Sequence, residues 1–377
     1  IFRFRYPQHN RMIRSLRQHL HDAQPFVAGF AQTNPGDLTP NLNARPGSGP
    51  TEDEFENTRL IGQRQADKAL ALSQKASEAL GGDIDSRILP RSANKPIQAM
   101  AFVESGAVER FGLGNEHISL ACASHNGEKR HVDTVRAWLG KVGVGEADLE
   151  CGTHPPRLQA NIEALVRENA VPTAAFNNCS GKHSGFLTTA VVNGEPTKGY
   201  IKYDHPVQRR LREVMSDLCG ENADDYAHGT DGCGIPTLAT PLRSLARAMA
   251  SMADPARLSS RRADAANRIR AAINAEPFMM AGTGRFCTRI NGLLPGVAQI
   301  KTGAEGVFCG MLPGLKLGIA LKVWDGAGRA AEVAMAALLA HLGVLSAGQK
   351  DELLHPPVKN VVGLLVGEMR PARSWLG

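Results

Sequence analysis

Residues 306–326 read GVFCGMLPGLKLGIALKVWDG and contain clear strand and turn signals. Two apolar runs of strand length are joined at Pro313 and Gly314, a pair that is typical of a turn. A segment with helical spacing of apolar residues follows, from about residue 328 to residue 345. The sequence therefore predicts two strands that form a hairpin, with a helix after them, and this pattern is typical of an α/β protein.

The composition of the 377-residue chain is that of a globular protein and allows one large domain or two. Hydrophobic residues make up 42% and charged residues 21%, which excludes a disordered, collagen-like or coiled-coil chain. Aromatic residues make up 5%, which argues against a base-stacking surface and against a ring-lined carbohydrate groove. The formal charge is +6, but the basic residues are spread along the chain, so we expect no nucleic-acid partner.

The seven cysteines are odd in number and widely spaced, unlike those of a secreted disulfide scaffold. We therefore expect a cytoplasmic location. The most apolar late stretch, residues 330–345, contains Glu332 and His341 and is too short to span a bilayer, so we expect no membrane association. The chain begins with Ile1 rather than Met and has no acidic residue before Asp22, which fits a cut fragment better than a transit segment.

The first part of the chain differs from the rest in composition and in the pattern of its predicted elements. Residues 34–56 cluster Pro, Gly, Asn and Asp and predict a long loop. Residues 58–82 place apolar side chains at helical spacing and stop at Gly81 and Gly82, which predicts one amphipathic helix of about five turns. From Arg87 onward, short helical patterns alternate with loop segments rich in Gly, Ser, Asn and Cys. Loops of this kind often contain functional residues.

Ser92 and Lys95 are three residues apart, and Pro96 is tolerated if it lies in the first turn of a helix that starts here. The serine and lysine side chains would then share one helix face. A partly desolvated lysine of lowered pKa can remove the proton of a serine hydroxyl, so this spacing suits a nucleophile and its base. The same pattern also fits a serine that caps a helix beside a solvated lysine.

Lys301, Thr302 and Gly303 lie directly before the predicted hairpin, in the order found around the Lys-Thr-Gly element of penicillin-recognising enzymes. The glycine lets a substrate backbone approach closely, and the lysine would orient a carboxylate or hold a second hydroxyl. An exposed turn lysine is the alternative. Ser124 follows an apolar run over residues 118–123 and is either a second reactive hydroxyl or a turn serine.

Two further loop motifs, CSGKH from Cys179 and DGCG from Asp231, place thiols on glycine-flanked loops. Thiolates suit zinc, and glycine lets the backbone wrap closely around the ion. Two thiols do not complete a four-coordinate site, so Lys182, His183, Asp231 or water would have to contribute. The alternative is that Cys179 and Cys233 are buried core thiols.

Eight motifs follow one another between about residues 87 and 367. They read PRSANKPIQA, FVESGAVERFGLGNEHISLACASHNGE, ECGTHPP, FNNCSGKHSGFL, DHPVQ, HGTDGCGIPT, AGTGRFCT and KTGAEGVFCG. Together they resemble the L-asparaginase II family of the Rhizobium etli type. The resemblance implies the serine β-lactamase and glutaminase fold, an α/β sandwich with the nucleophile at a helix start. It also implies hydrolysis of the side-chain amide of L-asparagine to L-aspartate and ammonia.

Carried onto this sequence, the resemblance implies specific site residues. They are two serine–lysine pairs (Ser92 with Lys95 and Ser124 with Lys301), a zinc ion held by Cys179, Lys182 and Cys233, and substrate contacts from Asp231 and His125. Ser92 would attack the amide carbon, ammonia would leave, and water would hydrolyse the acyl-enzyme. The motifs leave open which serine attacks and whether zinc acts chemically or only orients the substrate. We also expect a homodimer.

Residues 26–72 include the motif GDLTPN and resemble a fragment of the neutral ceramidases. Thr39 stands where that family has its nucleophilic serine, and no matching His-rich metal site is found, so this segment should not hydrolyse ceramide. We therefore divide the chain into an N-terminal segment, residues 1–86, and an asparaginase domain, residues 87–377. Strands that precede the PRSANKP motif in the family are not evident here, so we expect an incomplete N-terminal part of the sheet with unpaired edges.

Three functions remain open at this point. The chain is an amidohydrolase for L-asparagine, a penicillin-recognising serine hydrolase, or an inactive fusion that keeps the scaffold and binds through its basic surface. The two loop motifs that contain Cys179 and Cys233 favour the first function, because penicillin-recognising enzymes do not need them.

Overall fold

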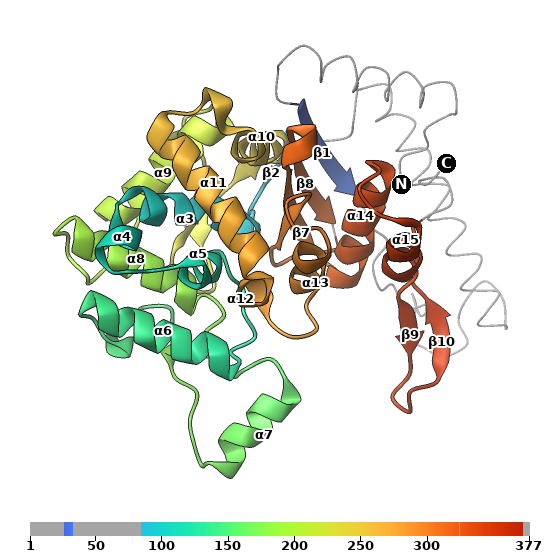
Figure 1. Cartoon of the computed structure of the whole chain (residues 1–377), viewed down its shortest axis with the longest axis horizontal. Coiled ribbons are helices and arrows are strands. Elements are labelled where there is room, and N and C mark those ends of the chain that lie inside the picture. Colours follow the sequence, from blue (N-terminus) through green and yellow to red (C-terminus); the bar gives the residue numbers. More distant parts are fainter. Residues whose placement is uncertain (1–25, 33–83, 324, 372–377) are drawn as a thin grey trace, which may run out of the picture.

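The computed structural model describes residues 26–32, 84–323 and 325–371 (Figure 1). The predicted loop over residues 34–56 and the predicted helix over residues 58–82 lie outside this range. The helices are α3 (Lys95–Glu104), α4 (Ala107–Arg110), α5 (Asn115–Ala121), α6 (Lys129–Val142), α7 (Gln159–Arg167), α8 (Ser180–Val192), α9 (Pro206–Cys219), α10 (Leu242–Ala253), α11 (Ser260–Ala275), α12 (Pro277–Ala281), α13 (Phe286–Leu293), α14 (Gly328–His341) and α15 (Ala347–Leu354).

The strands are short, and turns of 3₁₀ helix link several elements. The strands are β1 (Phe26–Gln32), β2 (Arg87–Ile88), β3 (His228–Thr230), β4 (Pro236–Leu238), β5 (Thr240–Pro241), β6 (Gln299–Thr302), β7 (Val307–Leu312), β8 (Leu317–Val323), β9 (Pro357–Lys359) and β10 (Leu365–Glu368). The 3₁₀ turns are η1 (Arg91–Asn94), η2 (Glu146–Asp148), η3 (Ala174–Phe176), η4 (Ala223–Asp225), η5 (Pro255–Arg257) and η6 (Pro313–Leu315). The protein is therefore a mixed α/β structure.

Four strands form the main sheet, in the order β1-β8-β7-β6. Strands β6, β7 and β8 are antiparallel neighbours. The predicted hairpin is confirmed, because β7 and β8 pair from Val307 opposite Lys322 to Leu312 opposite Leu317. The helix predicted after the hairpin is confirmed as α14.

Strand β1 was not predicted from the sequence. It runs parallel to β8, from Phe26 opposite Leu317 to Gln32 opposite Val323, so β8 lies inside the sheet. The β1 sequence, FVAGFAQ, is a nearly continuous apolar run without alternation, which is typical of strands in parallel pairs. The N-terminal segment of the chain thus contributes to the main sheet, and the expectation of an unpaired edge is not met at β8.

Helix α10 packs on the sheet over β8 and β1. A Cβ atom at Gly318 in β8 would overlap backbone atoms of Ala246 and Ala250 in this helix. The helix and the strand therefore approach each other more closely than a side chain at this position would allow. Strand β8 is buried along almost its whole length, and α14 packs against β7 and β8.

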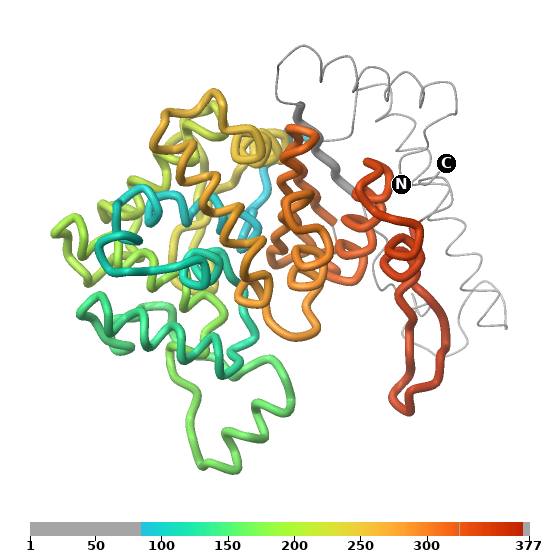
Figure 2. Tube along the Cα trace, viewed as in Figure 1, coloured from blue at the N-terminus to red at the C-terminus, as the bar shows by residue number. Residues whose placement is uncertain are grey.

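A helical part lies beside the sheet, and the trace in Figure 2 shows how its helices cross one another. Helix α3 packs against α8, α9 and α11. Trp138 of α6 is fully buried, and its ring centroid lies 5.1 Å from that of Phe102 in α3. The helix that begins with the Ser-x-x-Lys motif is therefore held on several sides by apolar packing.

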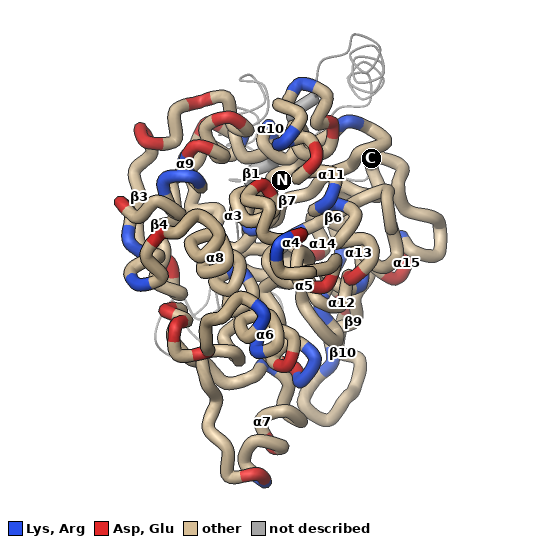
Figure 3. Tube along the Cα trace, turned by 60° about the vertical axis from the view of Figure 1, so that its left-hand side comes forward, with Lys and Arg blue, Asp and Glu red and all other residues tan. Residues whose placement is uncertain are grey.

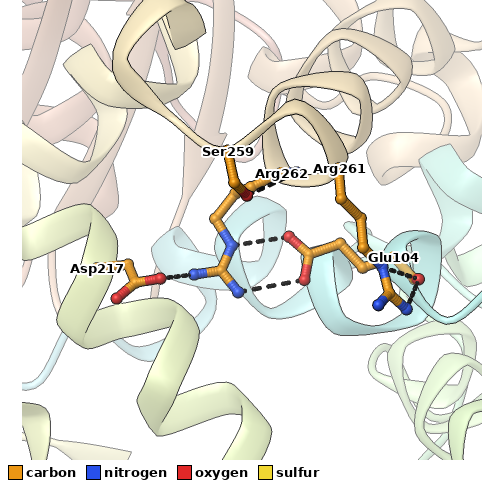
Figure 4. Close-up of polar contacts among 5 residues, drawn as sticks. All are labelled: Glu104, Asp217, Ser259, Arg261 and Arg262. Carbon is orange, nitrogen blue, oxygen red and sulfur yellow. Dashed lines mark hydrogen bonds and ion pairs between the residues drawn. The ribbon is translucent and has the colours of Figure 1, made fainter.

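An ionic cluster ties three of these helices together (Figure 4). Arg262 in α11 donates from Nε to Glu104 Oε1 at 2.8 Å and from Nη2 to Glu104 Oε2 at 3.2 Å. The same guanidinium forms an ion pair with Asp217 in α9. The Arg262 and Glu104 side chains are 14% and 13% exposed, so this two-pronged contact should stabilise the helices more than an exposed ion pair would.

The surface carries both signs of charge. Basic and acidic residues are interspersed along the trace in Figure 3, and no face of a single sign stands out in this view. Within the described ranges, no helix has the length and apolar character needed to cross a bilayer.

Candidate active site

Ser92 and Lys95 lie at the start of α3. Ser92 belongs to η1, and Lys95 is the first residue of the helix. Pro96 lies in the first turn, where the missing backbone N–H is not needed, so the predicted helix start is confirmed. Lys95 is fully buried and Ser92 is half-buried, so Ser92 is the more exposed residue of this pair.

Two lysine amines converge on one hydroxyl, that of Ser124. Lys95 donates from Nζ to Ser124 Oγ at 3.1 Å and also to the Ala123 carbonyl oxygen. Lys301 donates from Nζ to Ser124 Oγ at 2.8 Å. The Lys95 backbone N–H donates to the Ser92 carbonyl oxygen, but among the described residues no hydrogen bond joins the Lys95 amine to the Ser92 hydroxyl. The Lys95 amine therefore contacts the second serine of the predicted site rather than the first.

Lys301 reaches Ser124 because the edge of the sheet lies against the start of α3. Lys301 is in β6, the outer strand of the main sheet. A Cβ atom at Gly303 would lie 2.7 Å from the Pro90 carbonyl oxygen and 3.0 Å from the Ala93 nitrogen. The glycine thus permits a close approach, here between the strand end and the turn that carries Ser92.

Lys301 is 2% exposed, and this burial changes its protonation. Burial, and after it the positive charge of Lys95, lower the pKa of Lys301 to about 7. An amine with this pKa is largely neutral at slightly alkaline pH and can accept a proton from a hydroxyl. Ser124 and Lys301 therefore have the geometry and the chemistry of a hydroxyl and its base.

His125 was expected to contact the substrate, but the structure places it inside the scaffold. Its Nε2 lies 2.9 Å from Ser180 Oγ, and its Nδ1 accepts the backbone N–H of Gly127 at 3.1 Å. The side chain is 2% exposed, and burial together with the charge of His131 holds the pKa of His125 well below its usual value. Both ring nitrogens are thus engaged, and a neutral His125 fixes the loop that carries Ser124.

Asp231 faces the turn that carries Ser92. Arg91, which precedes Ser92, donates from Nε to Asp231 Oδ1 at 2.7 Å. Although burial alone would favour the neutral carboxyl, Lys182 and Arg91 lower the pKa of Asp231, so this group stays ionised. Arg91 also has a positive φ of 51°, a backbone conformation that is uncommon for a side chain of this size.

Cys179, Lys182 and Cys233 come together in the structure, and all three are buried. Lys182 donates from Nζ to Cys233 Sγ at 3.0 Å. A hydrogen bond from Cys233 holds the pKa of the Cys179 thiol well below its usual value, although burial opposes this. Burial also favours a neutral Lys182, but the two thiols, once ionised, raise the pKa of its amine.

The chemistry of these three donors fits a zinc ion. Thiolates and a nitrogen donor are the ligand types that zinc prefers, and the thiol–amine contacts already bring the donor atoms close together. No group of three His, Cys, Asp or Glu side chains that could hold a metal occurs among the described residues. A zinc site here would therefore need the amine of Lys182 as a ligand in addition to the two thiols.

Two arginines beside the serines were not identified from the sequence. Arg91 had one usable signal, its position next to Ser92. Arg285 directly precedes α13 and donates from Nη1 to Asn126 Oδ1 at 3.2 Å and to the Ser124 carbonyl oxygen at 3.4 Å. Nothing in the spacing of the AGTGRFCT motif indicates that its arginine meets the Ser124 loop.

The fold and this site define an α/β protein with two serines and two lysines at the meeting point of a sheet edge and a helix start. The family model of L-asparaginase II matches residues 64–371, which is most of the chain. The chain therefore belongs to the L-asparaginase II family, and the resemblance inferred from the eight motifs is confirmed.

The N-terminal segment matches a different family. The model of neutral/alkaline non-lysosomal ceramidase, N-terminal, matches residues 10–92. The neutral ceramidase of Pseudomonas aeruginosa is 58% identical over 62 residues, which are 16% of this chain and 9% of that protein. Neutral ceramidase 3 of Arabidopsis thaliana is 38% identical over 101 residues, which cover 20% of this chain and 14% of that protein. The chain thus spans only a small part of these relatives, and the ceramidase resemblance is confirmed for the segment alone.

Proposed function

We propose that this chain hydrolyses the side-chain amide of L-asparagine to L-aspartate and ammonia through a serine acyl-enzyme. One observation carries the proposal: the amines of Lys95 and Lys301 meet at the Ser124 hydroxyl, beside the half-buried Ser92. Amines placed in this way can take protons from a serine that attacks an amide carbon. Membership of the L-asparaginase II family points to the same reaction.

The arrangement of the site also supports a serine β-lactamase and glutaminase-like sandwich. In that fold a Ser-x-x-Lys turn at a helix start faces an outer strand that carries Lys-Thr-Gly. Here η1 lies against the end of β6, where Gly303 approaches Pro90. This contact between the sheet edge and the helix start is the relation that such a fold requires.

Ser92 is the attacking group in the proposed mechanism, because it is half-buried whereas Ser124 is 5% exposed. Lys95 first passes a proton through Ser124 to the neutral Lys301. The Ser92 oxygen then bonds to the amide carbon while its proton passes to the amine that Lys95 has thereby freed, one turn away. The oxyanion then collapses, the C–N bond breaks, and the leaving nitrogen takes a proton from the same relay to depart as ammonia.

Water completes the reaction. It attacks the carbonyl carbon of the ester on Ser92 and gives its proton to the same amine relay. The bond between the Ser92 oxygen and the acyl carbon breaks, the serine is protonated again, and L-aspartate is released. Ser124 contacts both amines and stays inside the protein, so it serves as the proton link between them.

Zinc is part of the proposal through Cys179, Lys182 and Cys233, which would hold the ion. When bound, it would supply a Lewis acid that polarises a carbonyl oxygen or a fixed charge that orients the substrate. Asp231 lies two residues before Cys233 on the same loop and is held ionised by Lys182 and Arg91. A carboxylate in this position is suited to the α-ammonium group of the substrate.

A penicillin-recognising serine hydrolase is the second candidate, favoured by the contact of Gly303 with the Ser92 turn. The thiol–amine cluster favours asparagine hydrolysis instead. The test is to supply the full-length chain with L-asparagine and with nitrocefin and to measure ammonia and nitrocefin turnover. We expect ammonia without nitrocefin turnover. The reverse result would assign the second function, and the absence of both activities would indicate an inactive fusion.

A further inference from the structure

The proposed mechanism gives the α-carboxylate of the substrate no binding partner. In asparagine this group is separated from the side-chain amide by only the Cα and Cβ atoms. A cation that binds it must therefore lie close to the reacting serines. Guanidinium groups suit carboxylates best, because their planar N–H donors match the two oxygens.

Most cations near the serines already have partners. Lys95 and Lys301 contact Ser124, Lys182 contacts Cys233, and Arg91 contacts Asp231 and Glu305. Arg285 differs from Arg91, because its guanidinium bonds only to neutral oxygens, those of Asn126 and of the Ser124 backbone. It differs from the three lysines because it has no role in the proton relay or the zinc site. No carboxylate in the described part of the chain forms an ion pair with Arg285.

The position of Arg285 is built into the loop. Asn126 donates from Nδ2 to the Thr283 carbonyl oxygen at 2.9 Å and to Glu128 Oε1 at 3.1 Å, which turns its own Oδ1 toward Arg285. Glu128 in turn accepts the backbone N–H of Thr283 at 2.7 Å. The guanidinium is thus oriented before any ligand arrives, which reduces the entropic cost of binding.

A second guanidinium, that of Arg157, lies near Arg285. The backbone N–H of Arg157 donates to the Asn126 carbonyl oxygen at 2.8 Å, and its side chain is exposed. Burial, and after it the charge of Arg157, lower the pKa of Arg285. Glu332 on α14 interacts electrostatically with both arginines, but it forms an ion pair with neither among the described contacts. An anion between the two guanidinium groups would relieve their repulsion.

We infer that Arg285, assisted by Arg157, binds the α-carboxylate of the amino-acid substrate. The inference rests on the proposed amidohydrolase function for the identity of that substrate. It makes Arg285 a substrate-binding residue and sets the distance between the anchored carboxylate and the reacting serine. A longer amino acid such as glutamine would then place its amide less well for attack.

The test compares two substrates of the full-length chain, L-asparagine and 3-aminopropanamide, which lacks only the carboxylate. Arg285→Gln should raise KM for L-asparagine and lower kcat/KM by roughly 30- to 100-fold, the size of a charge-assisted pair. The same variant should change kcat/KM for 3-aminopropanamide by less than about threefold. Arg285→Lys should recover part of the loss. Arg289→Gln is the matched control, because Arg289 lies in α13 one turn after Arg285 but pairs with Glu352, and both substrates should be unaffected.

Equal losses on both substrates would overturn the inference, because they would show that Arg285 only holds the Ser124 loop. Calorimetric titration with L-aspartate gives a second measurement that does not need turnover. Arg285→Gln should raise the Kd for L-aspartate by a similar factor. If the wild-type chain binds L-aspartate through Arg285 but releases no ammonia, the proposed function fails and this inference stands. If the wild-type chain and the variant bind L-aspartate equally, or neither binds it, the inference is wrong.

Discussion

Lys301 Nζ lies 2.8 Å from Ser124 Oγ, although the two residues are 177 positions apart in the chain. The contact joins the outer strand of the sheet to the loop after α5. The hydroxyl and the amine therefore meet only when the sheet and the helical part have assembled against each other. The geometry of the candidate site therefore depends on the packing of β6 against η1.

We expect amide hydrolysis to accelerate as the pH rises through about 7, the pKa of Lys301. Below this value Lys301 is protonated and cannot accept a proton, so kcat/KM should fall roughly tenfold per pH unit. Above it the profile should level off. A pH–rate profile of the full-length chain measures this, and a rate that stays flat between about pH 6 and 9 would contradict a role for Lys301 as the proton acceptor.

Lys301→Met serves as the control for that profile. It should remove the rising limb together with nearly all activity. Because methionine buries no charge, the variant should unfold at a higher temperature than the wild type, by an amount equivalent to ~1 kcal/mol. An inactive variant that is also less stable would instead point to a structural defect.

Gly303→Ala should impair the site more than the fold. The added Cβ would lie 2.7 Å from the Pro90 carbonyl oxygen, so the turn that carries Ser92 must shift. A displacement of about 1 Å near reacting groups can cost roughly 100-fold in rate, and we expect a loss of this order in kcat. Gly314→Ala is the matched control, since nothing lies within 4 Å of a Cβ there, and it should retain full activity.

The sequence predicted those features that depend on local pattern. The hairpin of β7 and β8 follows from two apolar runs around Pro313, and the helix start at Lys95 follows from Pro96. Strand β1 could not be predicted in this way, because its partner β8 lies about 290 residues further along the chain. No local signal marks a parallel pairing over that distance.

In the candidate site, too, contacts between distant parts of the chain could not be predicted from the sequence. Residue types and spacing identified the serines and lysines, and their relation in space came only from the structure. The Lys95 amine turns to Ser124 rather than to Ser92, and His125 turns inward to Ser180. Both orientations depend on elements that fold against α3 from distant parts of the chain.

Glu104→Ala should destabilise the protein by about 2 kcal/mol, a value between those of exposed and buried ion pairs. The change removes the carboxylate that accepts two hydrogen bonds from the half-buried Arg262 (Figure 4). Glu109→Ala is the control, because this side chain is 62% exposed and pairs with Arg268 at the surface. We expect the control to change the free energy of unfolding by less than ~0.5 kcal/mol in chemical denaturation. Equal effects of the two variants would show that the cluster contributes no more than a surface pair.

The purified full-length chain should contain about one zinc ion, held by Cys179, Lys182 and Cys233. Lys182→Ala should lose most of the metal, since two thiols alone leave the site incomplete. Cys219→Ala should retain it, because this buried free thiol lies outside the cluster. Elemental analysis measures the content, and a metal-free protein in which Cys179 and Cys233 react freely with alkylating reagents would exclude the zinc site.

Variants of Ser92, Lys95 and Ser124 identify the nucleophile. If Ser92 attacks and Lys95 is its base, then Ser92→Ala and Lys95→Met should each abolish turnover, and the double variant should be scarcely worse, because the two residues act as one unit. Ser124→Ala should then still form an acyl-enzyme slowly, since Ser124 only links Lys95 to Lys301. Attack by Ser124 predicts the opposite: Ser124→Ala blocks acylation and Ser92→Ala does not. Trapping the intermediate from labelled asparagine and locating the modified serine by mass spectrometry decides between them. Label on Ser124 would reverse the roles proposed here, and label on neither serine would exclude an acyl-enzyme mechanism.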